Sequence, residues 1–188
     1  MTPLLKTALK WWRMVLRSDI SEQRGWQQPQ QQQPAHLYVD ARSTPPRCAA
    51  VLFLDGRKYY TDGKPGTRHM KSIGKRGDGQ ILSLELMAIA VGLATFADEL
   101  QGRQVWIFED NTGAEAATRK GSCRADDHNA LIHEIWSIAL TYGMNLWLDR
   151  VPSDDNLSDL PSREEYALLQ EIGAVWKPPL IPELSGLV

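Results

Sequence analysis

The chain has 188 residues, a formal net charge of -2, 43% hydrophobic residues and 23% charged residues. This composition is typical of a globular protein and not of a disordered one, and it argues against a surface that binds nucleic acid all over, although a local basic patch remains possible. The two cysteines, Cys48 and Cys123, form no C-x-x-C pair. Neither a disulfide framework nor a zinc site is therefore predicted, and an intracellular setting, cytoplasmic or nuclear, is expected.

The first 20 residues predict an amphipathic helix. Apolar residues recur there at helical spacing, with Lys6, Lys10, Arg13 and Arg17 between them. We expect this helix to pack against the main domain or a neighbouring one, and a basic helix on a membrane surface is the alternative. No continuous apolar run marks a secretory signal.

Three further segments complete the expected domain organisation. Residues 21–35 contain the polar run QQPQQQQP, which has nothing to bury and predicts a tether. Residues 36–175 are expected to fold as one domain. Residues 176–188, with three prolines, predict an extended tail.

The folded domain is predicted to open with an antiparallel meander. His36–Asp40 and Cys48–Leu54 have the pattern of strands, and a returning strand, Lys58–Thr61, follows the hairpin signal Asp55-Gly56. Residues 62–79 are glycine-rich and basic, so they predict either a solvated loop or a contact with a phosphate backbone.

Residues 81–97, ILSLELMAIAVGLATFA, predict a helix that is covered on all sides. Its one charge is Glu85. Burial of an ionised carboxylate removes its hydration, which costs roughly several kcal/mol of free energy unless another interaction compensates. Three readings stay open at this point: the carboxylate reaches water near the helix end, it pairs with a Lys or Arg, or it binds a metal ion.

The remaining pattern alternates strands and helices. Strands are expected at 104–108 and 144–151, with helices at 112–120, from Asp126 or Asp127 to about Tyr142, and after a capping box formed by Ser162 and Glu165. Asn111 or Thr112 would cap the first of these helices. Strands separated by helices imply parallel neighbours. The fold class is therefore α/β: a five-stranded mixed sheet in which strands 1–3 are antiparallel, strands 1, 4 and 5 are parallel, and helices cover both faces.

Four carboxylates are predicted to meet at one edge of this sheet. Asp40 ends the first strand, Asp110 ends the fourth, Glu85 lies in the first turns of the buried helix and Asp159 lies at the entry to the last helix. Such acids repel one another unless cations are present, and oxygen ligands suit Mg²⁺ or Mn²⁺. Each acid also has an ordinary explanation, as a turn starter, a helix cap or a helix-dipole partner.

Four segments carry a resemblance to a known family: LYVDA, SLELMAIA, FEDNTGAEAA and RVPSDDNLSDLPSR. Together they resemble the acidic motifs of ribonuclease H, and the last one is most similar to the ribonuclease H domain of DIRS-like and related long-terminal-repeat retrotransposon reverse transcriptases. The resemblance covers about Leu37 to Gly173 and implies a ribonuclease H-like fold.

The resemblance also implies a chemistry, namely Mg²⁺-dependent cleavage, with Mn²⁺ as a substitute, of the RNA strand of an RNA·DNA hybrid to leave 5′-phosphates. Asp40 would bridge two metal ions. Glu85 and Asp110 would complete the site nearer the leaving oxygen, and Asp159 would hold the other ion with Asp40. A polymerase domain, in cis or in trans, is the implied partner.

Nucleic-acid contacts are expected from a second set of residues. Asn111 and Asn156 would contact the minor groove or order the site, and Ser83, taken to lie on the same side of its helix as Glu85, would do the same. The basic contacts would come from Arg119, Lys120, Arg124 and Arg163.

Three departures from the family pattern bear on this expectation. The loop 152–158 holds no histidine, Cys48 stands where the family often has glycine, and no long basic insertion follows Asp110. A catalytically silent binding or structural module of the same fold is the alternative. A DNA nuclease of this fold ranks lower, because Asp40-Ala41-Arg42 lacks the Asp-x-Glu of the related exonucleases.

Overall fold

The computed structural model describes residues 3–17, 33–73, 77 and 80–182, and in this part of the chain it forms one six-stranded sheet. The strand order is β5-β4-β1-β2-β3-β6. The strands are β1 (Ala35–Ser43), β2 (Pro46–Leu54), β3 (Arg57–Gly63), β4 (Gln104–Glu109), β5 (Asn145–Arg150) and β6 (Val175–Trp176). β2 is antiparallel to β1 and β3, whereas the pairs β1–β4, β4–β5 and β3–β6 are parallel.

The predicted α/β class and the mixed sheet are confirmed, with one more strand than expected. The additional strand, β6, has two residues and pairs with Tyr59 and Tyr60 at the free edge of β3. It arises where the segment after α8 runs alongside β3, whose backbone would otherwise lack a partner on that side.

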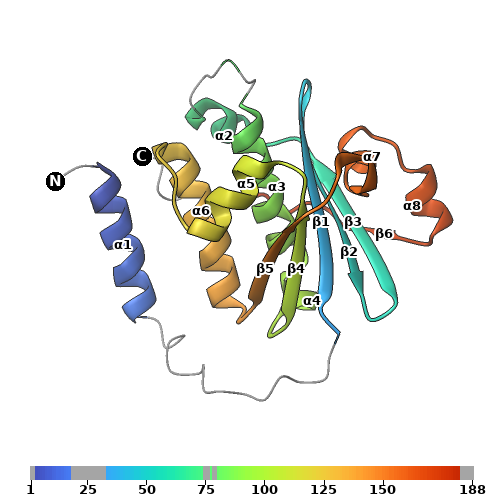
Figure 1. Cartoon of the computed structure of the whole chain (residues 1–188), viewed down its shortest axis with the longest axis horizontal. Helices are drawn as coiled ribbons and strands as arrows, with labels where there is room; N and C mark the ends of the chain where they lie inside the picture. Colours follow the sequence, from blue (N-terminus) through green and yellow to red (C-terminus); the bar gives the residue numbers. More distant parts are fainter. Residues whose placement is uncertain (1–2, 18–32, 74–76, 78–79, 183–188) are drawn as a thin grey trace.

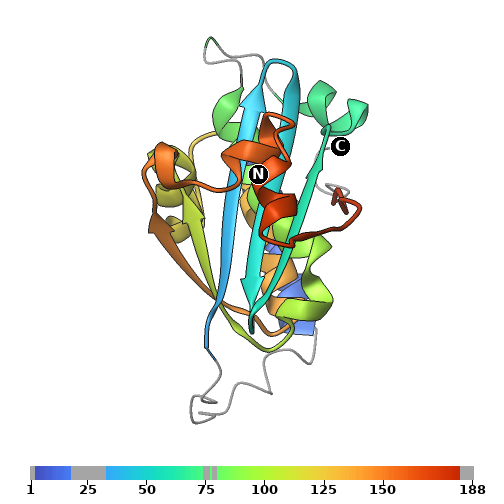
Figure 2. The same cartoon turned by 90° about the vertical axis from the view of Figure 1, so that its right-hand side faces the viewer.

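Helices cover both faces of the sheet (Figure 1). α3 packs across β1 and β2, and α6 packs on the outer side of α3. On the opposite face α7 and α8 lie over β1, β2 and β3 (Figure 2). The helices are α1 (Pro3–Arg17), α2 (Thr67–Ser72), α3 (Ile81–Thr95), α4 (Ala97–Leu100), α5 (Thr112–Lys120), α6 (Asp126–Thr141), α7 (Asp159–Ser162) and α8 (Ala167–Glu171), with a 3-10 turn at Ser153–Asp155. None of these helices is long and apolar enough to cross a bilayer.

α3 is the centre of the main core. It is enclosed by the sheet on one side and by α6 on the other, which explains why nearly every position of its sequence is apolar. Gly92 allows the close approach: a Cβ at this position would lie 3.0 Å from the Ala50 Cβ of β2 and 3.4 Å from the Leu37 side chain of β1.

A second, smaller core lies under α8, where Leu169 packs with Val51 and Tyr60. Beside it, Asp62 is buried and holds three segments together. It pairs with Arg47 of β2 and accepts hydrogen bonds from Tyr166 Oη (3.0 Å) and Trp176 Nε1 (3.2 Å). This network ties the start of α8 and the strand β6 to β2 and β3.

Several predicted boundaries were wrong. Asp62 belongs to β3 and not to a basic loop, and α2 forms within that loop; residues 74–76, 78 and 79 lie outside the described part, as does most of the predicted tether. The predicted capping box does not form, because Ser162 ends α7 and Glu164 adopts a left-handed φ of 66° that separates α7 from α8. α6 begins at Asp126 with Ala125 as its N-cap, so neither aspartate is the N-cap. Asp126 and Asp127 lie in the first turn, where their negative charges interact favourably with the positive end of the helix dipole.

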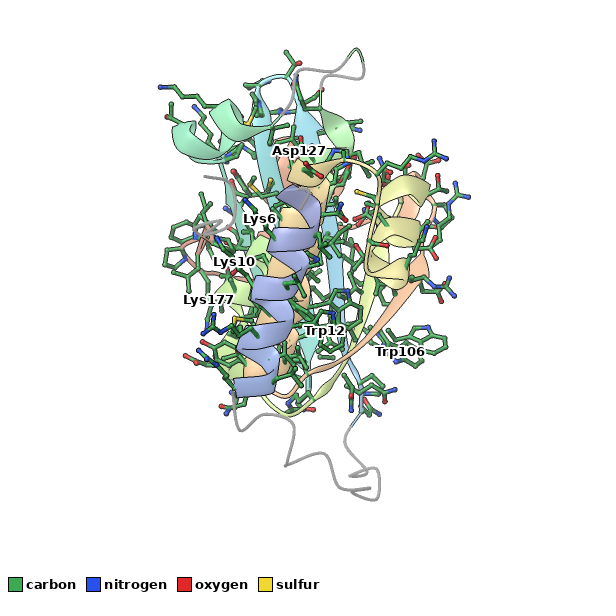
Figure 3. The ribbon with its side chains drawn as sticks, turned by 90° about the vertical axis from the view of Figure 1, so that its left-hand side faces the viewer. Lys6, Lys10, Trp12, Trp106, Asp127 and Lys177 are labelled. Atoms are coloured by element: carbon green, nitrogen blue, oxygen red, sulfur yellow. The ribbon has the colours of Figure 1, made fainter. Side chains whose placement is uncertain are left out.

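α1 packs against α6 through Trp11. The Trp11 Nε1 donates a hydrogen bond to Ser137 Oγ (3.0 Å), and its ring stacks on His133 with centroids 5.8 Å apart. The helix therefore lies against the folded domain, as the sequence led us to expect (Figure 3).

We expect Gly92→Ala to lower the free energy of unfolding by about 1–2 kcal/mol, because the new methyl group presses on the Ala50 Cβ of β2. The cost of this overlap exceeds the gain of about 1 kcal/mol in helix propensity. The matched control is Gly66→Ala, where a Cβ meets nothing within 4 Å. Urea unfolding of both variants measures the difference. Equal stability of Gly92→Ala and the unchanged chain would show that α3 can move away from the sheet.

Candidate active site

Three carboxylates from three elements meet at the end of the sheet where β1 and β4 lead. Asp40 comes from β1, Glu85 from α3, and Asp110 from the residue after β4. One carboxylate oxygen of each lies within 4.8 Å of the others. The parallel register of β1 and β4, in which Tyr38 pairs with Phe108, places Asp40 and Asp110 two residues further along at the same level. The structure thus brings together three of the four predicted acids.

The sequence predicted that Asp40 ends the first strand, and this prediction was wrong. β1 continues to Ser43 because Ala41, Arg42 and Ser43 remain paired with β2. Asp40 is therefore held in a strand that is paired with β2 at that position, and only 6% of the surface of Asp40 is exposed.

Burial and mutual repulsion act on these acids together. Burial raises the pKa of Asp40 to about 6, and the nearby Asp110 and Asp159 carboxylates add to the rise, while the Ser162 hydroxyl and the Arg163 guanidinium oppose it. Burial also raises the pKa of Glu85 far above its ordinary value, with further contributions from Glu109, Asp40 and Asp110.

Glu85 is 3% exposed, which excludes a carboxylate that reaches water, and no Lys or Arg in the described part of the chain pairs with it. Its Oε2 atom is buried with no hydrogen-bond partner. Of the three readings that the sequence left open, a bound cation is the one that agrees with this environment. An oxygen-only donor set with one orphaned oxygen fits a hard divalent ion such as Mg²⁺ or Mn²⁺.

Glu109 is a further acid that the sequence analysis did not assign. It is fully buried, its Oε1 accepts a hydrogen bond from the Asn111 backbone N–H (2.9 Å), and its Oε2 has no partner. Burial raises its pKa well above the ordinary value. The period-two alternation of β4 was the available signal, because it places Glu109 on the core side with Val105 and Ile107.

Asp159, the fourth predicted acid, lies outside the cluster of three. It stands in the first turn of α7, where its Oδ1 pairs with Arg163 Nε at 2.8 Å. Asp159 is nevertheless close enough to contribute to the raised pKa of Asp40, and burial raises its own pKa, against the opposing effect of Arg163. The ion pair is of the i,i+4 type and largely exposed, so it opposes a rearrangement by only about 0.5 kcal/mol.

Two asparagines hold the backbone around the acids. Asn156 is buried, and its Nδ2 donates to the Val39 carbonyl of β1 (2.9 Å) while its Oδ1 accepts from Ser158 Oγ (2.6 Å). Asn111 is the N-cap of α5, because its Oδ1 accepts from the Gly113 and Ala114 N–H groups. Of the two roles expected for Asn156, the structure therefore agrees with ordering the site.

The expectation for Ser83 needs correction. Residues two apart on a helix point about 200° away from each other, so Ser83 does not share a side with Glu85. Ser83 is also fully buried, and it presents nothing to a duplex. The proposed basic contacts lie at the surface: Arg119 pairs with Glu115, Arg163 pairs with Asp159, and Lys120 and Arg124 are exposed.

Comparison with solved structures identifies the fold. RNase H1 from the halophilic archaeon Halobacterium salinarum superposes with a TM-score of 0.54 at 15% sequence identity, over 73% of this chain and 99% of that one. The N-terminal RNase H domain of a Mycobacterium tuberculosis protein, solved as a fusion with maltose-binding protein, superposes with a TM-score of 0.51 at 12% identity, over 73% and 97%. No protein-family model and no curated protein sequence matches the chain. The chain therefore has the ribonuclease H-like fold.

Without a divalent ion, we expect the protein to lose stability as the pH rises from about 4 to about 6. The pKa of Asp40 is raised from 3.8 to about 6, so the folded state binds the proton more tightly, and its contribution is complete below 3.8 and lost above 6. This shift corresponds to roughly 3 kcal/mol. Asp40→Asn should remove only the share of this dependence that Asp40 contributes, because burial also raises the pKa of Glu85 and of Glu109, whereas Asp98→Asn, at an exposed acid on α4, should leave the dependence unchanged.

Thermal unfolding at a series of pH values, with EDTA and then with Mn²⁺, measures both effects. We expect Mn²⁺ to raise the melting temperature increasingly as the pH rises, because the ion competes with protons for Asp40 and for Glu85, whose pKa burial raises further still. A melting temperature that Mn²⁺ does not change at pH 7 would contradict a metal site at this cluster.

Proposed function

We propose that this protein is a divalent-metal-dependent endonuclease that hydrolyses the RNA strand of RNA·DNA hybrids and leaves 5′-phosphates. The observation that supports it most directly is the convergence of Asp40, Glu85 and Asp110 within 4.8 Å, two of them buried, with no cationic side chain paired to them among the described residues. The choice of an RNA·DNA hybrid as the substrate class is supported by the ribonuclease H-like fold and by the motif resemblance.

Each acid would have a distinct task in this reaction. Asp40, whose strand is paired with β2 at that position, would be the central ligand, Glu85 and Asp110 would complete one ion site, and Asp159 would join Asp40 at a second one. Two divalent ions would supply a polarised scissile phosphate and an activated water. Asn156 fixes β1 behind Asp40, and Asn111 fixes the N-terminus of α5 beside Asp110. For Asp40, Glu85 and Asp110, the chain's own contribution is thus a set of oxygens already close together, whereas Asp159 would have to leave Arg163.

The proposed biological context is a retroelement reverse transcriptase, from which the domain would derive and whose polymerase domain would act with it in cis or in trans. The support is the motif resemblance, in particular DNTGAE and the run from Val151 to Arg163. The 2′-hydroxyl of RNA is the group by which such a site separates RNA from DNA.

One observation favours a second candidate, a silent module of the same fold that binds without turnover. Asp159 pairs with Arg163 and not with the other acids, which leaves the second ion site incomplete in this conformation. The ion pair is weak, however, and a divalent ion would displace it at little cost.

The test is cleavage of a labelled hybrid with Mg²⁺ or Mn²⁺. We expect Asp110→Asn to lower the rate at least about 100-fold, because an amide cannot replace the carboxylate at an ion site, and we expect double-stranded DNA and RNA to remain intact. Mapping of the product ends should show 5′-phosphates on the RNA.

Asp98→Asn, which changes the same side chain on an exposed part of α4, is the matched control and should leave the rate unchanged. Equal rates for Asp110→Asn and the unchanged chain would refute the proposed site. Hybrid binding without cleavage under any metal condition would instead support the silent module.

A further inference from the structure

We infer that α1 is a second nucleic-acid contact, which binds the phosphate backbone of the substrate through a line of four cations. The inference rests on the proposed function for the identity of the duplex. We call this line the basic stripe: Lys6, Lys10, Arg13 and Arg17. Its members follow one another at i, i+4, i+7 and i+11, so they occupy one side of the helix, and all four are exposed.

The charge of the basic stripe is not neutralised. None of its four members forms an ion pair within the described part of the chain, and α1 contains no acidic residue. Five arginines in the described part of the folded domain differ in this respect. Arg42, Arg47, Arg103, Arg119 and Arg163 are all paired with carboxylates.

The acid cluster itself attracts divalent ions and not a phosphodiester backbone. Arg163, the cation that acts on Asp40, is already engaged by Asp159. Cations away from the cluster would therefore add affinity for a polyanion, mainly through the release of counterions from its backbone.

The basic stripe is also held in a fixed place. Trp11 anchors α1 to α6 by its hydrogen bond to Ser137 and its stack on His133. α1 packs on α6, and the start of α1 lies toward the end of the molecule to which β1 leads (Figure 1). Asp40 lies in the second half of β1, and Lys6 lies near the start of α1 (Figure 3). From Lys6 to Arg17 the stripe rises about 16 Å, which matches the rise of about five nucleotides.

α1 has a second outward stripe, which is apolar. Leu5, Leu9, Trp12 and Leu16 are 48%, 51%, 55% and 73% exposed and lie between the α6-facing side and the basic stripe. Lys6 and Lys10 lie along one edge of the helix and Trp12 along the other (Figure 3). A helix that lies in a membrane interface buries a broad apolar face in the lipid. Here α6 already covers the Trp11 side of α1, which leaves less apolar surface for a lipid and favours the duplex.

The experiment measures hybrid binding by fluorescence anisotropy in the Asp110→Asn background at fixed Mg²⁺, across about 50 to 200 mM KCl. The quadruple variant Lys6→Gln, Lys10→Gln, Arg13→Gln and Arg17→Gln keeps helix propensity while it removes the charge. We expect it to weaken binding about tenfold or more at low salt, and to reduce the slope of log K against log salt by about 3–4, close to 0.9 for each lost phosphate contact.

Two double variants that each remove two positive charges test whether the effect depends on where the charges lie. Lys10→Gln with Arg13→Gln, on α1, should reduce the slope of log K against log salt by about 2. Arg57→Gln with Lys58→Gln removes two cations from the start of β3, at the other end of the sheet from Asp40, and should change this slope little. Equal effects of the two double variants, or an unchanged slope in the quadruple variant, would overturn the proposal.

Two further outcomes separate this proposal from its rivals. If the unchanged chain binds the hybrid with the expected salt dependence but never cleaves it, the proposed catalysis fails while the α1 contact stands. If the quadruple variant keeps hybrid affinity but no longer binds phosphatidylserine–phosphatidylcholine vesicles that the unchanged chain binds, α1 is a membrane helix and the inference is wrong.

Discussion

Repulsion between buried carboxylates is the constraint on which the rest of the structure depends. Asp40 and Glu85 are each almost fully buried, Glu109 is completely buried, and Asp110 stands beside them. Such a group of acids destabilises the folded state whenever the acids are ionised. The surrounding fold must therefore be rigid enough to hold them, and the environment strongly favours a bound divalent ion.

The rigidity comes from elements that are fixed on more than one side. β1 pairs with β2 along its length and with β4 over its first half, α3 lies between the sheet and α6, and Asn156 ties the loop before α7 to the backbone of β1. Asp62 has a similar role on the other face, where it joins β2, α8 and β6 through Arg47, Tyr166 and Trp176. Oxygens held in this way lose little further freedom when they bind an ion, which is the preorganisation that a catalytic site needs.

The distribution of cations complements this arrangement. Around the acids the basic side chains are engaged in ion pairs, so they stabilise the fold more than they attract a ligand. Four cations without an ion pair in the described part of the chain lie along one side of α1, which is attached to the domain at Trp11. Separate regions of one small chain thus meet the opposite requirements of binding divalent cations and binding a polyanion.

The sequence by itself determined the elements and the kind of chemistry. A run of apolar residues around Glu85 predicted a buried helix with an uncompensated charge, and alternating strands and helices predicted the mixed sheet and the meeting of Asp40 with Asp110. These signals are local, because they depend on periodicity and on the order of elements along the chain. The alternation of β4 also places Glu109 on the core side, and the predicted burial of residues 81–97 includes Ser83. Only the tertiary structure decided that Asp159 pairs with Arg163 and that β6 completes the sheet. Each of these depends on contacts between segments far apart in the chain, or on a side-chain direction that spacing alone does not fix.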